Sequence, residues 1–332
     1  MTLRAARITA GLTQAELADR AGVTRQLVSA VEANRNEPGV RAGVALARAL
    51  GTTVEALFAN EQTVSPMSVI PGVIPDGPAH LGIVGNRTVV AAVSRDAVLG
   101  GAVTNAQTTA GISRLLPGAE PSGLVVAGCE PAIGLAAAGL SNRRSTMAVH
   151  TSSLVAINAL AAGTIHAATV HGRRNRLPPR PVGVAAFTLA TWRTGVGLRA
   201  GVARSLSELI ERRITVIQRD PSAESQQAFA RATKQLGGTP VASIVAAGHL
   251  EAARRVAFGA DAAVTNEPSA LAHGLTFLPA ETHVVQLWVP DEYLTDRAVR
   301  ELLDLLTTAA FQARLAAIGG YDLTGCGDRV AA

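Results

Sequence analysis

The chain has 332 residues, a length that predicts two or more domains with a sizeable core. Its formal net charge of +5 favours an anionic partner such as DNA without establishing one. It has two cysteines, Cys129 and Cys326, which excludes a disulfide framework and suits a reducing compartment. No apolar run reaches the roughly 18 residues of a membrane span, and the first residues lack the features of a signal peptide. We therefore expect a cytoplasmic protein without a membrane partner.

Residues 11–32 predict two short helices joined by a tight turn. Thr13 is a favourable N-cap, and Glu16 follows three positions later, which together form a capping box. A helix is therefore expected over 14–21. Gly22 suits the left-handed backbone that ends such a helix.

The second helix of this unit is expected to begin after Thr24, another favourable N-cap. Val28 and Val31 recur at helical spacing on one face, whereas Arg25 and Gln26 stand on the other. In a DNA major groove Arg reads guanine and Gln reads adenine through paired hydrogen bonds, each worth about 1–3 kcal/mol of discrimination. The pattern predicts that the start of this helix reaches base edges.

Residues 1–60 resemble the lambda-repressor-like helix-turn-helix of the Xre family. The matching segments are GLTQAELA, the Arg25–Gln26 pair, SAVE and LARALGTTVEALF. The resemblance implies an all-α head that binds DNA, and it assigns the contacts to Gln14, Thr24, Arg25, Gln26 and Ser29. A helical bundle that binds protein in place of DNA is the alternative.

The segment after this head reads as a linker followed by a hairpin. Residues 61–79 contain four prolines and show no helical period, so a linker is expected there. Two β-prone runs, HLGIV and RTVVAAV, flank Gly85–Asn86 and predict a hairpin with a type II′ turn. Residues 80–120 are therefore expected to form a small β-hairpin subdomain.

From residue 121 onward, apolar runs alternate with helical segments. Such alternation predicts a parallel α/β sheet with helices on both faces. Helices are expected over 131–140, 153–162, 224–236, 250–258, from 269, and over 296–317. Strands are expected at GLVVAGC, MAVH, IHAATVHG, ITVIQ, VASIV, AAVT, FLPA and VVQLWV, with FTLATW and VGLRAG as strands near a crossing between lobes.

The stretch 121–328 resembles the periplasmic-binding-protein-like domain that is related to molybdate-binding proteins and occurs fused to Xre-type heads. The matching segments are LVVAGCEPAIGL, HTSSLVAINALAAGTIHAATVHG, WRTGVGLRAG, GADAAVTNEPSALAHGLTFLPAE and IGGYDLTG. The resemblance implies two α/β lobes, about 121–175 with 280–332 and about 176–279, with a ligand in the cleft between them.

In folds of this kind, ligands lie outside the carboxyl ends of strands and against helix N-termini. Four loops have that place here, at 129–131, 151–153, 221–225 and 265–267, and Glu281 lies near the expected hinge. The expected ligand-binding residues are Glu130, Thr151, Ser152, Ser153, Ser222, Glu224, Ser225, Asn266 and Glu281.

The third of these loops departs from the family pattern. Relatives tend to have Gly-Ser-Gly-Thr-Arg, whereas residues 222–226 read Ser-Ala-Glu-Ser-Gln. An acid beside a doubly charged anion costs energy. We therefore expect a neutral or cationic organic ligand in place of molybdate or tungstate, or a site that has lost ligand binding.

Metal and catalytic motifs are weak in this sequence. His166 and His171 lie five positions apart on one predicted strand and would point to opposite faces, which is poor metal geometry. Ser152 and Ser153 lack the Gly-x-Ser-x-Gly elbow of a nucleophile. The sequence therefore predicts no metal ligands, no cofactor and no catalytic residues.

These patterns predict a multidomain chain: an all-α helix-turn-helix head over 1–60, a linker over 61–79, a β subdomain over 80–120 and an α/β two-lobed sensor over 121–332. The expected function is a transcriptional regulator that binds a palindromic double-stranded DNA operator as a homodimer or higher homo-oligomer. An unknown small-molecule effector would close the lobes. One alternative is a regulator with a vestigial, ligand-free sensor used for dimerisation or partner binding. The other is a DNA-tethered enzyme, which would need a convergent nucleophile, base and oxyanion hole.

Overall fold

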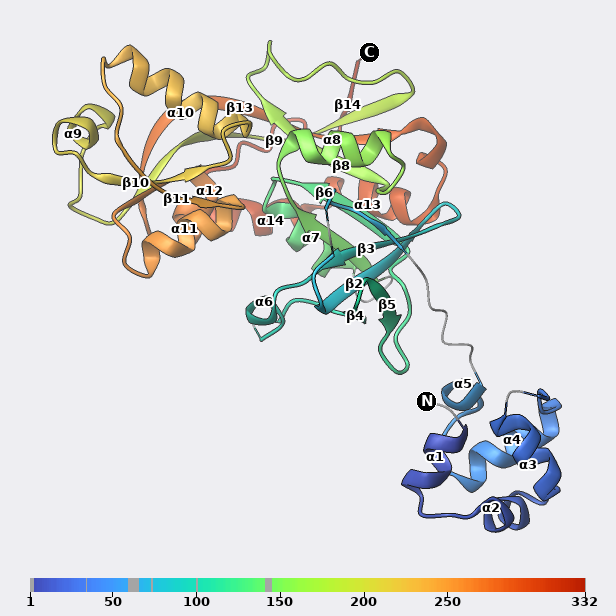
Figure 1. Cartoon of the computed structure of the whole chain (residues 1–332). Helices are drawn as coiled ribbons and strands as arrows, with labels where there is room; N and C mark the ends of the chain where they lie inside the picture. Colours follow the sequence, from blue (N-terminus) through green and yellow to red (C-terminus); the bar gives the residue numbers. More distant parts are fainter. Residues whose placement is uncertain are drawn as a thin grey trace.

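The computed structural model describes residues 3–33, 35–58, 66–72, 74–99, 101–140 and 145–331. Its amino-terminal unit is helical (Figure 1). The helices are α1 (Leu3–Thr9), α2 (Gln14–Ala21), α3 (Arg25–Glu32), α4 (Val40–Ala49) and α5 (Val54–Phe58). Leu17, Val28 and Leu46 are fully buried at the centre of their shared core. The amphipathic spacing seen in the sequence therefore forms a small bundle core.

The predicted capping box at the start of α2 is confirmed. The Thr13 hydroxyl accepts a hydrogen bond from the Glu16 amide at 3.2 Å, and the Glu16 carboxylate accepts one from the Thr13 amide at 2.7 Å. Gly22 ends α2 in the left-handed region at φ +63°. These local interactions fix the turn between α2 and α3, and so they set the direction in which α3 leaves the bundle.

A five-stranded sheet follows, in the order β1-β3-β2-β4-β5. Its elements are β1 (Met67–Ser68), β2 (Gly77–Val84), β3 (Arg87–Ala92), α6 (Arg95–Leu99), β4 (Ala106–Thr109) and β5 (Ile112–Leu115). The predicted hairpin is present, with Val84 opposite Arg87 and Gly85 at φ +58° in the two-residue turn.

The predicted linker and subdomain boundaries differ from the structure in two ways. Residues 61–65 and 73 lie outside the described part of the chain, but β1 and the first residues of β2 already belong to the sheet because each pairs with a neighbouring strand. Val69 and Val89 also share a buried core with Val125 and Met147 from the next unit. This β unit therefore packs on the sheet that follows it and is not separate from it.

The rest of the chain is built on a nine-stranded sheet, ordered β11-β10-β12-β9-β13-β8-β6-β7 with β14 paired to β9. The strands are β6 (Leu124–Gly128), β7 (Thr146–His150), β8 (Ala167–Gly172), β9 (Val184–Leu198), β10 (Thr215–Arg219), β11 (Val241–Ala246), β12 (Ala262–Asn266), β13 (Thr276–Pro290) and β14 (Arg329–Val330).

Two long strands at the centre, β9 and β13, correct the sequence prediction. FTLATW and VGLRAG form one strand, and so do FLPA and VVQLWV, because register shifts between Pro279 and Glu281 and between Val285 and Gln286 let the pairing continue. Both strands pair antiparallel with their neighbours, so the sheet is mixed and not wholly parallel. Their two halves belong to different lobes, and the chain passes between the lobes along them (Figure 1).

Helices cover the sheet in both lobes (Figure 1). They are α7 (Ala132–Leu140), α8 (Ser153–Ala161), α9 (Leu206–Glu211), α10 (Glu224–Gln235), α11 (His249–Ala257), α12 (Glu267–Ala272), the 3-10 turn η1 (Asp291–Tyr293), α13 (Arg297–Thr307) and α14 (Ala309–Ile318). The single helix predicted over 296–317 is two, because Thr308 is extended at ψ 135° and caps α14. Among the described residues, no helix has the length and apolarity to cross a membrane.

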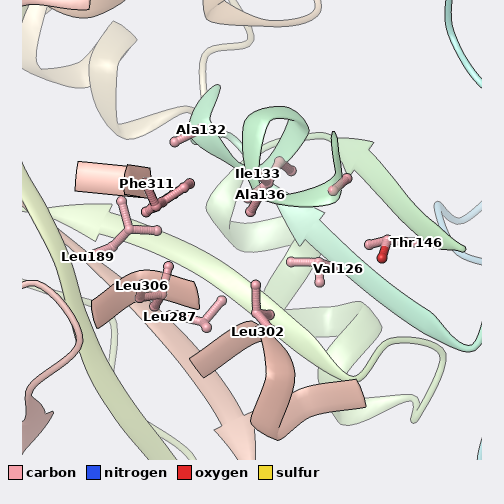
Figure 2. Close-up of a pocket in the computed structure, with 11 residues that line it drawn as sticks. Val126, Ala132, Ile133, Ala136, Thr146, Leu189, Leu287, Leu302, Leu306 and Phe311 are labelled. Atoms are coloured by element: carbon pink, nitrogen blue, oxygen red, sulfur yellow. The ribbon is translucent and has the colours of Figure 1, made fainter. Parts of the chain in front are cut away.

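The core of the first lobe contains a small apolar cavity of about 10 Å³. Figure 2 shows it between α7 and the carboxyl-terminal helices, with Ile133, Leu302 and Phe311 pointing into it. A space of this size accommodates about one water molecule, and its walls are almost entirely apolar. It is therefore a packing void in the core and no candidate for a binding site.

Candidate functional site

The amino-terminal end of α3 presents polar side chains to solvent. Thr24 caps the helix by accepting a hydrogen bond from the Leu27 amide at 3.1 Å. Arg25 and Gln26 are exposed, and Ser29 is half-buried. Because Val28 faces the core, these polar side chains stand on the outer face of the helix, as the sequence predicted.

The side chain of Gln14 forms a hydrogen bond within the protein, which the sequence did not predict. Its side-chain amide nitrogen donates to the Glu32 carboxylate at 2.9 Å, and this bond joins α2 to α3. Glu32 also forms a two-point ion pair with Arg7, at 2.6 and 3.0 Å. The hydrogen bond from Arg7 lowers the pKa of Glu32, so the carboxylate stays ionised. Arg7 was not identified from the sequence, since nothing local marks its partner 25 positions away.

A cleft of about 900 Å³ lies between the two lobes. The first lobe contributes Cys129 and Thr151 to its wall, and the second lobe contributes His249 and Arg254. Ala97 of α6 also lines it, so the β unit that follows the amino-terminal helices forms part of the same wall. The volume lies within the range of about 300–1,000 Å³ typical of small-molecule sites.

Glu130 is buried beneath this cleft and does not line it. Its carboxylate accepts hydrogen bonds from the Trp192 indole at 2.6 Å, the Tyr321 hydroxyl at 2.7 Å and the Ala132 amide at 2.9 Å. Burial raises the pKa of Glu130, and these three donors oppose that rise. The structure therefore places this predicted ligand-binding residue in an internal network that joins β9 to the carboxyl-terminal segment.

The three residues of the second predicted loop, 151–153, lie in three different environments. Thr151 lines the cleft. Ser152 is the N-cap of α8 and accepts a hydrogen bond from the Val155 amide at 3.3 Å. Ser153 is buried, with its hydroxyl 3.4 Å from the Cys129 sulfur and 3.2 Å from the His171 amide. Of the three, Thr151 alone is placed to touch a molecule in the cleft directly.

The third predicted loop, 221–225, directs most of its polar groups to partners within the protein. Ser222 is exposed, and its amide donates to Asp220 at 2.8 Å. Glu224 forms an ion pair with Arg231 at 2.7 Å. Ser225 is 1% exposed, and its hydroxyl has no hydrogen-bond partner among the described residues. The acid that departs from the family pattern is thus neutralised by an arginine of its own helix.

Asn266 and Glu281 complete the set of predicted ligand-binding residues. Asn266 caps α12, accepting a hydrogen bond from the Ser269 amide at 3.1 Å, while its buried amide nitrogen meets no partner in the described part of the chain. Glu281 pairs with Arg231 through both oxygens, at 2.7 and 2.8 Å. That pairing, with His283 and Arg173 also near, lowers the pKa of Glu281 to about 2.

The structure brings together polar residues that sequence reasoning left scattered. His171, His249 and His283 pack around Trp192, with ring centroids between 4.7 and 5.9 Å apart. Arg219 ends β10 and is 2% exposed, donating to the carbonyls of residues 246 and 247. A charged residue at the end of a buried strand was the available signal for Arg219. No local signal unites the histidines.

Comparisons with known proteins agree with this two-part architecture. Residues 3–57 match a helix-turn-helix family, and residues 136–307 match the PBP superfamily domain. The chain is 49% identical over 49 residues to an uncharacterized HTH-type transcriptional regulator of Methanothermobacter thermautotrophicus, a match that covers 14% of this chain and 71% of that protein.

Solved structures similar to this chain include the regulatory domain of HypT from Salmonella typhimurium in its bromide-bound form, with 12% identity and a TM-score of 0.44 over 58% of this chain and 94% of that one. A phosphate transport receptor from Vibrio cholerae has 12% identity and a TM-score of 0.42 over 60% of this chain and 99% of that one. The effector-binding domain of QuiR in complex with shikimate has 11% identity and a TM-score of 0.41, with 55% and 92% covered.

The helical unit and the two-lobed α/β unit are thus each recognised independently of the fold description above. A helix-turn-helix similar to that of an HTH-type transcriptional regulator therefore occurs in one chain with a PBP superfamily domain. The chain belongs to the PBP superfamily domain family, joined at its amino terminus to a helix-turn-helix domain of the Xre-like type.

Proposed function

We propose that this chain is a sequence-specific transcriptional regulator whose two-lobed domain binds a small molecule in the cleft between its lobes. The observation that carries the proposal is the start of α3, where Arg25 and Gln26 are exposed on a helix whose opposite face is buried. In a helix-turn-helix, the first residues of the second helix enter the major groove and contact base edges. Arg25 would read guanine and Gln26 adenine.

Gln14, Thr24 and Ser29 would support this contact. Gln14 begins α2, where its backbone amide would bind a DNA phosphate while its side chain stays bonded to Glu32. Thr24 fixes the start of α3 through its cap. Ser29, one turn further along the helix, would reach the groove edge.

The path from the cleft to the head would run through α6. Ala97 of α6 forms part of the cleft wall, and the strands around α6 share a core with the first lobe. A ligand that binds the closed arrangement more tightly would shift the population toward it and move this wall. A coupling of about 1–3 kcal/mol between ligand and DNA would follow.

We further propose that the chain acts in the cytoplasm as a homodimer on a palindromic operator, with half-sites about one helical turn apart. The edge strand β11 supports self-association, because its outward apolar side chains, including Ile244 at 51% and Val245 at 57% exposure, are uncovered. Both cysteines are buried free thiols, as suits a reducing compartment.

Binding of the purified full-length protein to fragments of its own genome tests this proposal. We expect a small set of fragments to be retained at moderate salt and to share a two-fold symmetric sequence. Retention of no fragment, or of all fragments equally, would contradict the regulator. The genes beside the retained fragments would then nominate candidate effectors.

A regulator with a vestigial sensor is the second candidate. The ion pairs of Arg231 with Glu224 and Glu281 favour it, because they already bind two carboxylates that were predicted to bind ligand. Thermal unfolding with the nominated effectors distinguishes the two candidates, because a ligand at a hundredfold its Kd adds about 2.7 kcal/mol of stability. A stabilising compound supports sensing, whereas no shift with any compound of the regulated pathway supports the vestigial sensor.

A further inference from the structure

Three side chains able to bind a metal ion converge at the floor of the cleft. The Cys129 sulfur, a ring nitrogen of His171 and a ring nitrogen of His249 all lie within 4.8 Å of one another. Each residue is at most 5% exposed. In a tetrahedral zinc site, ligand atoms lie about 3.3–3.8 Å apart, so small movements would bring these three onto one ion.

The fold fixes these residues from both lobes. Cys129 follows β6, and Gly128 before it lies at φ +148°, where an added Cβ would collide with Thr169 of the neighbouring strand. This close approach places Cys129 beside β8, which carries His171. His249 is the first residue of α11 in the second lobe. The three therefore meet where the lobes face each other.

A relay of hydrogen bonds determines which nitrogen of His171 is free. The ionised Glu281 carboxylate lies 3.3 Å from His283 Nε2 and accepts a hydrogen bond, so that nitrogen carries the proton. With its proton on Nε2, the buried His283 ring presents Nδ1 as an acceptor toward His171. His171 Nδ1, at 2.9 Å, must then be the donor. Neutral His171 is left with a bare lone pair on Nε2, the form that binds a metal.

His249 provides a second and independent observation. It is 2% exposed, and neither of its ring nitrogens has a hydrogen-bond partner among the residues that the structure describes. A buried imidazole without partners forfeits the hydrogen bonds that it would make with water, which destabilises the folded state. An ion bound at this position would restore a partner to one of the two nitrogens.

We propose that Cys129, His171 and His249 bind one transition-metal ion of the zinc class, with a fourth coordination position directed into the cleft. One thiolate and two imidazoles are ligands that Zn²⁺ prefers, and a site with three protein ligands keeps one position open. Cys129 and His249 line the cleft, so the open position faces its space. This site stands whether or not the head reads DNA, and the sequence alone predicted no metal here.

Charge at the site is the main opposing factor. Burial raises the pKa of the Cys129 thiol to about 11, so binding must displace a proton, which passes to solvent as the sulfur–metal bond forms. A coordinated thiol is deprotonated outright by the ion's own charge. Arg219 is the nearby cation: it lowers the pKa of the thiol, as a metal does, but its own charge also opposes binding of a second cation beside Cys129.

A second cluster, Glu224 with Glu281 and His283, is a weaker candidate for a metal ion. Its ligand atoms also lie within 4.8 Å of one another. The Arg231 guanidinium already bonds to both carboxylates, at 2.7 to 2.8 Å. A cation at that place would have to displace a bonded arginine, whereas in the described part of the chain Arg219 approaches the cysteine-containing cluster but donates its hydrogen bonds to the carbonyls of residues 246 and 247.

Titration of the reduced full-length protein with Co²⁺ tests the proposal, because cobalt replaces zinc and its thiolate complexes absorb light. We expect one ion per chain, the d–d bands of tetrahedral cobalt, a sulfur-to-cobalt charge-transfer band, and loss of all three on addition of Zn²⁺. Cys129→Ala should abolish the charge-transfer band. Cys326→Ala should retain it, since that second buried thiol faces the Leu306 carbonyl in the core.

His249→Gln gives a second variant, with folding monitored by near-UV circular dichroism. It should keep the fold and lose tight cobalt binding, and it decides the matter if Cys129→Ala does not fold. Absence of stoichiometric binding by the wild-type protein would overturn the proposal. So would a charge-transfer band that survives Cys129→Ala or disappears in Cys326→Ala. Retention of genomic fragments is measured separately on metal-free protein, so failure of the regulator leaves this result intact.

Discussion

Arg231 and Glu281 form a two-point ion pair, with Nε 2.7 Å from Oε1 and Nη2 2.8 Å from Oε2. The pair joins α10 of the second lobe to the long strand β13. Arg231 also bonds to Glu224 at 2.7 Å. One arginine thus satisfies two carboxylates that the sequence had suggested for ligand binding, which explains how an acid is tolerated in the third loop.

Replacement of Arg231 should destabilise the two-lobed domain. We expect Arg231→Gln to cost about 1–3 kcal/mol, because it leaves two partly buried carboxylates without their charged donor. Urea unfolding followed by tryptophan fluorescence reports on this domain, since both tryptophans, Trp192 and Trp288, lie in its core. As a control, Arg297→Gln removes an exposed i,i+4 pair with Glu301 and should cost about 0.3–0.5 kcal/mol. Equal losses of unfolding free energy in the two variants would contradict this role of Arg231.

Acid should remove the stabilisation that Glu281 provides. Its folded pKa of about 2 lies below the unfolded value, so the unfolded state binds the extra proton. The contribution is full above about pH 5 and is lost as the pH falls toward about 2. Arg231, Arg173 and His283 face this carboxylate. We expect the difference in unfolding free energy between wild type and Glu281→Gln to be constant above pH 5 and to shrink below it. A difference independent of pH across this window would refute the assignment.

The Arg7–Glu32 pair should stabilise the amino-terminal bundle. Glu32→Gln removes the charge that binds Arg7 and Gln14, and we expect a loss of about 1–3 kcal/mol in the protection of α1–α3 amides. Hydrogen exchange in the full-length protein measures this locally. The matched control Glu37→Gln changes an exposed acid of the same unit and should leave protection unchanged. Protection that is the same in wild type and Glu32→Gln would exclude a structural role for the pair.

Local sequence signals predicted local structure well. The capping box at Thr13, the cap at Thr24 and the Gly85–Asn86 turn each depend on residues within a few positions of one another, and each is confirmed. The break at Thr308 was missed. The continuity of the two crossing strands was also missed, because continued pairing along β9 and β13 depends on partners far along the chain.

The interior of the cleft depends on long-range contacts and was predicted less well. Glu130 was expected to bind ligand, but its partners Trp192 and Tyr321 lie 62 and 191 positions away. His171 and His283 are 112 positions apart and meet only because β8 and β13 are adjacent in the sheet. Periodicity identifies which face of an element is buried, whereas such pairings follow from strand order.

The affinity of the full-length protein for an operator and for unrelated DNA, measured for wild type and for the Arg25→Ala, Gln26→Ala double variant, tests the central claim most directly. We predict that the double variant loses roughly 2–6 kcal/mol of operator preference, about 30-fold or more, while binding to unrelated DNA changes little. Arg48→Ala removes one exposed charge from α4 and should leave the preference intact. Unchanged operator preference in the double variant would contradict base reading by α3.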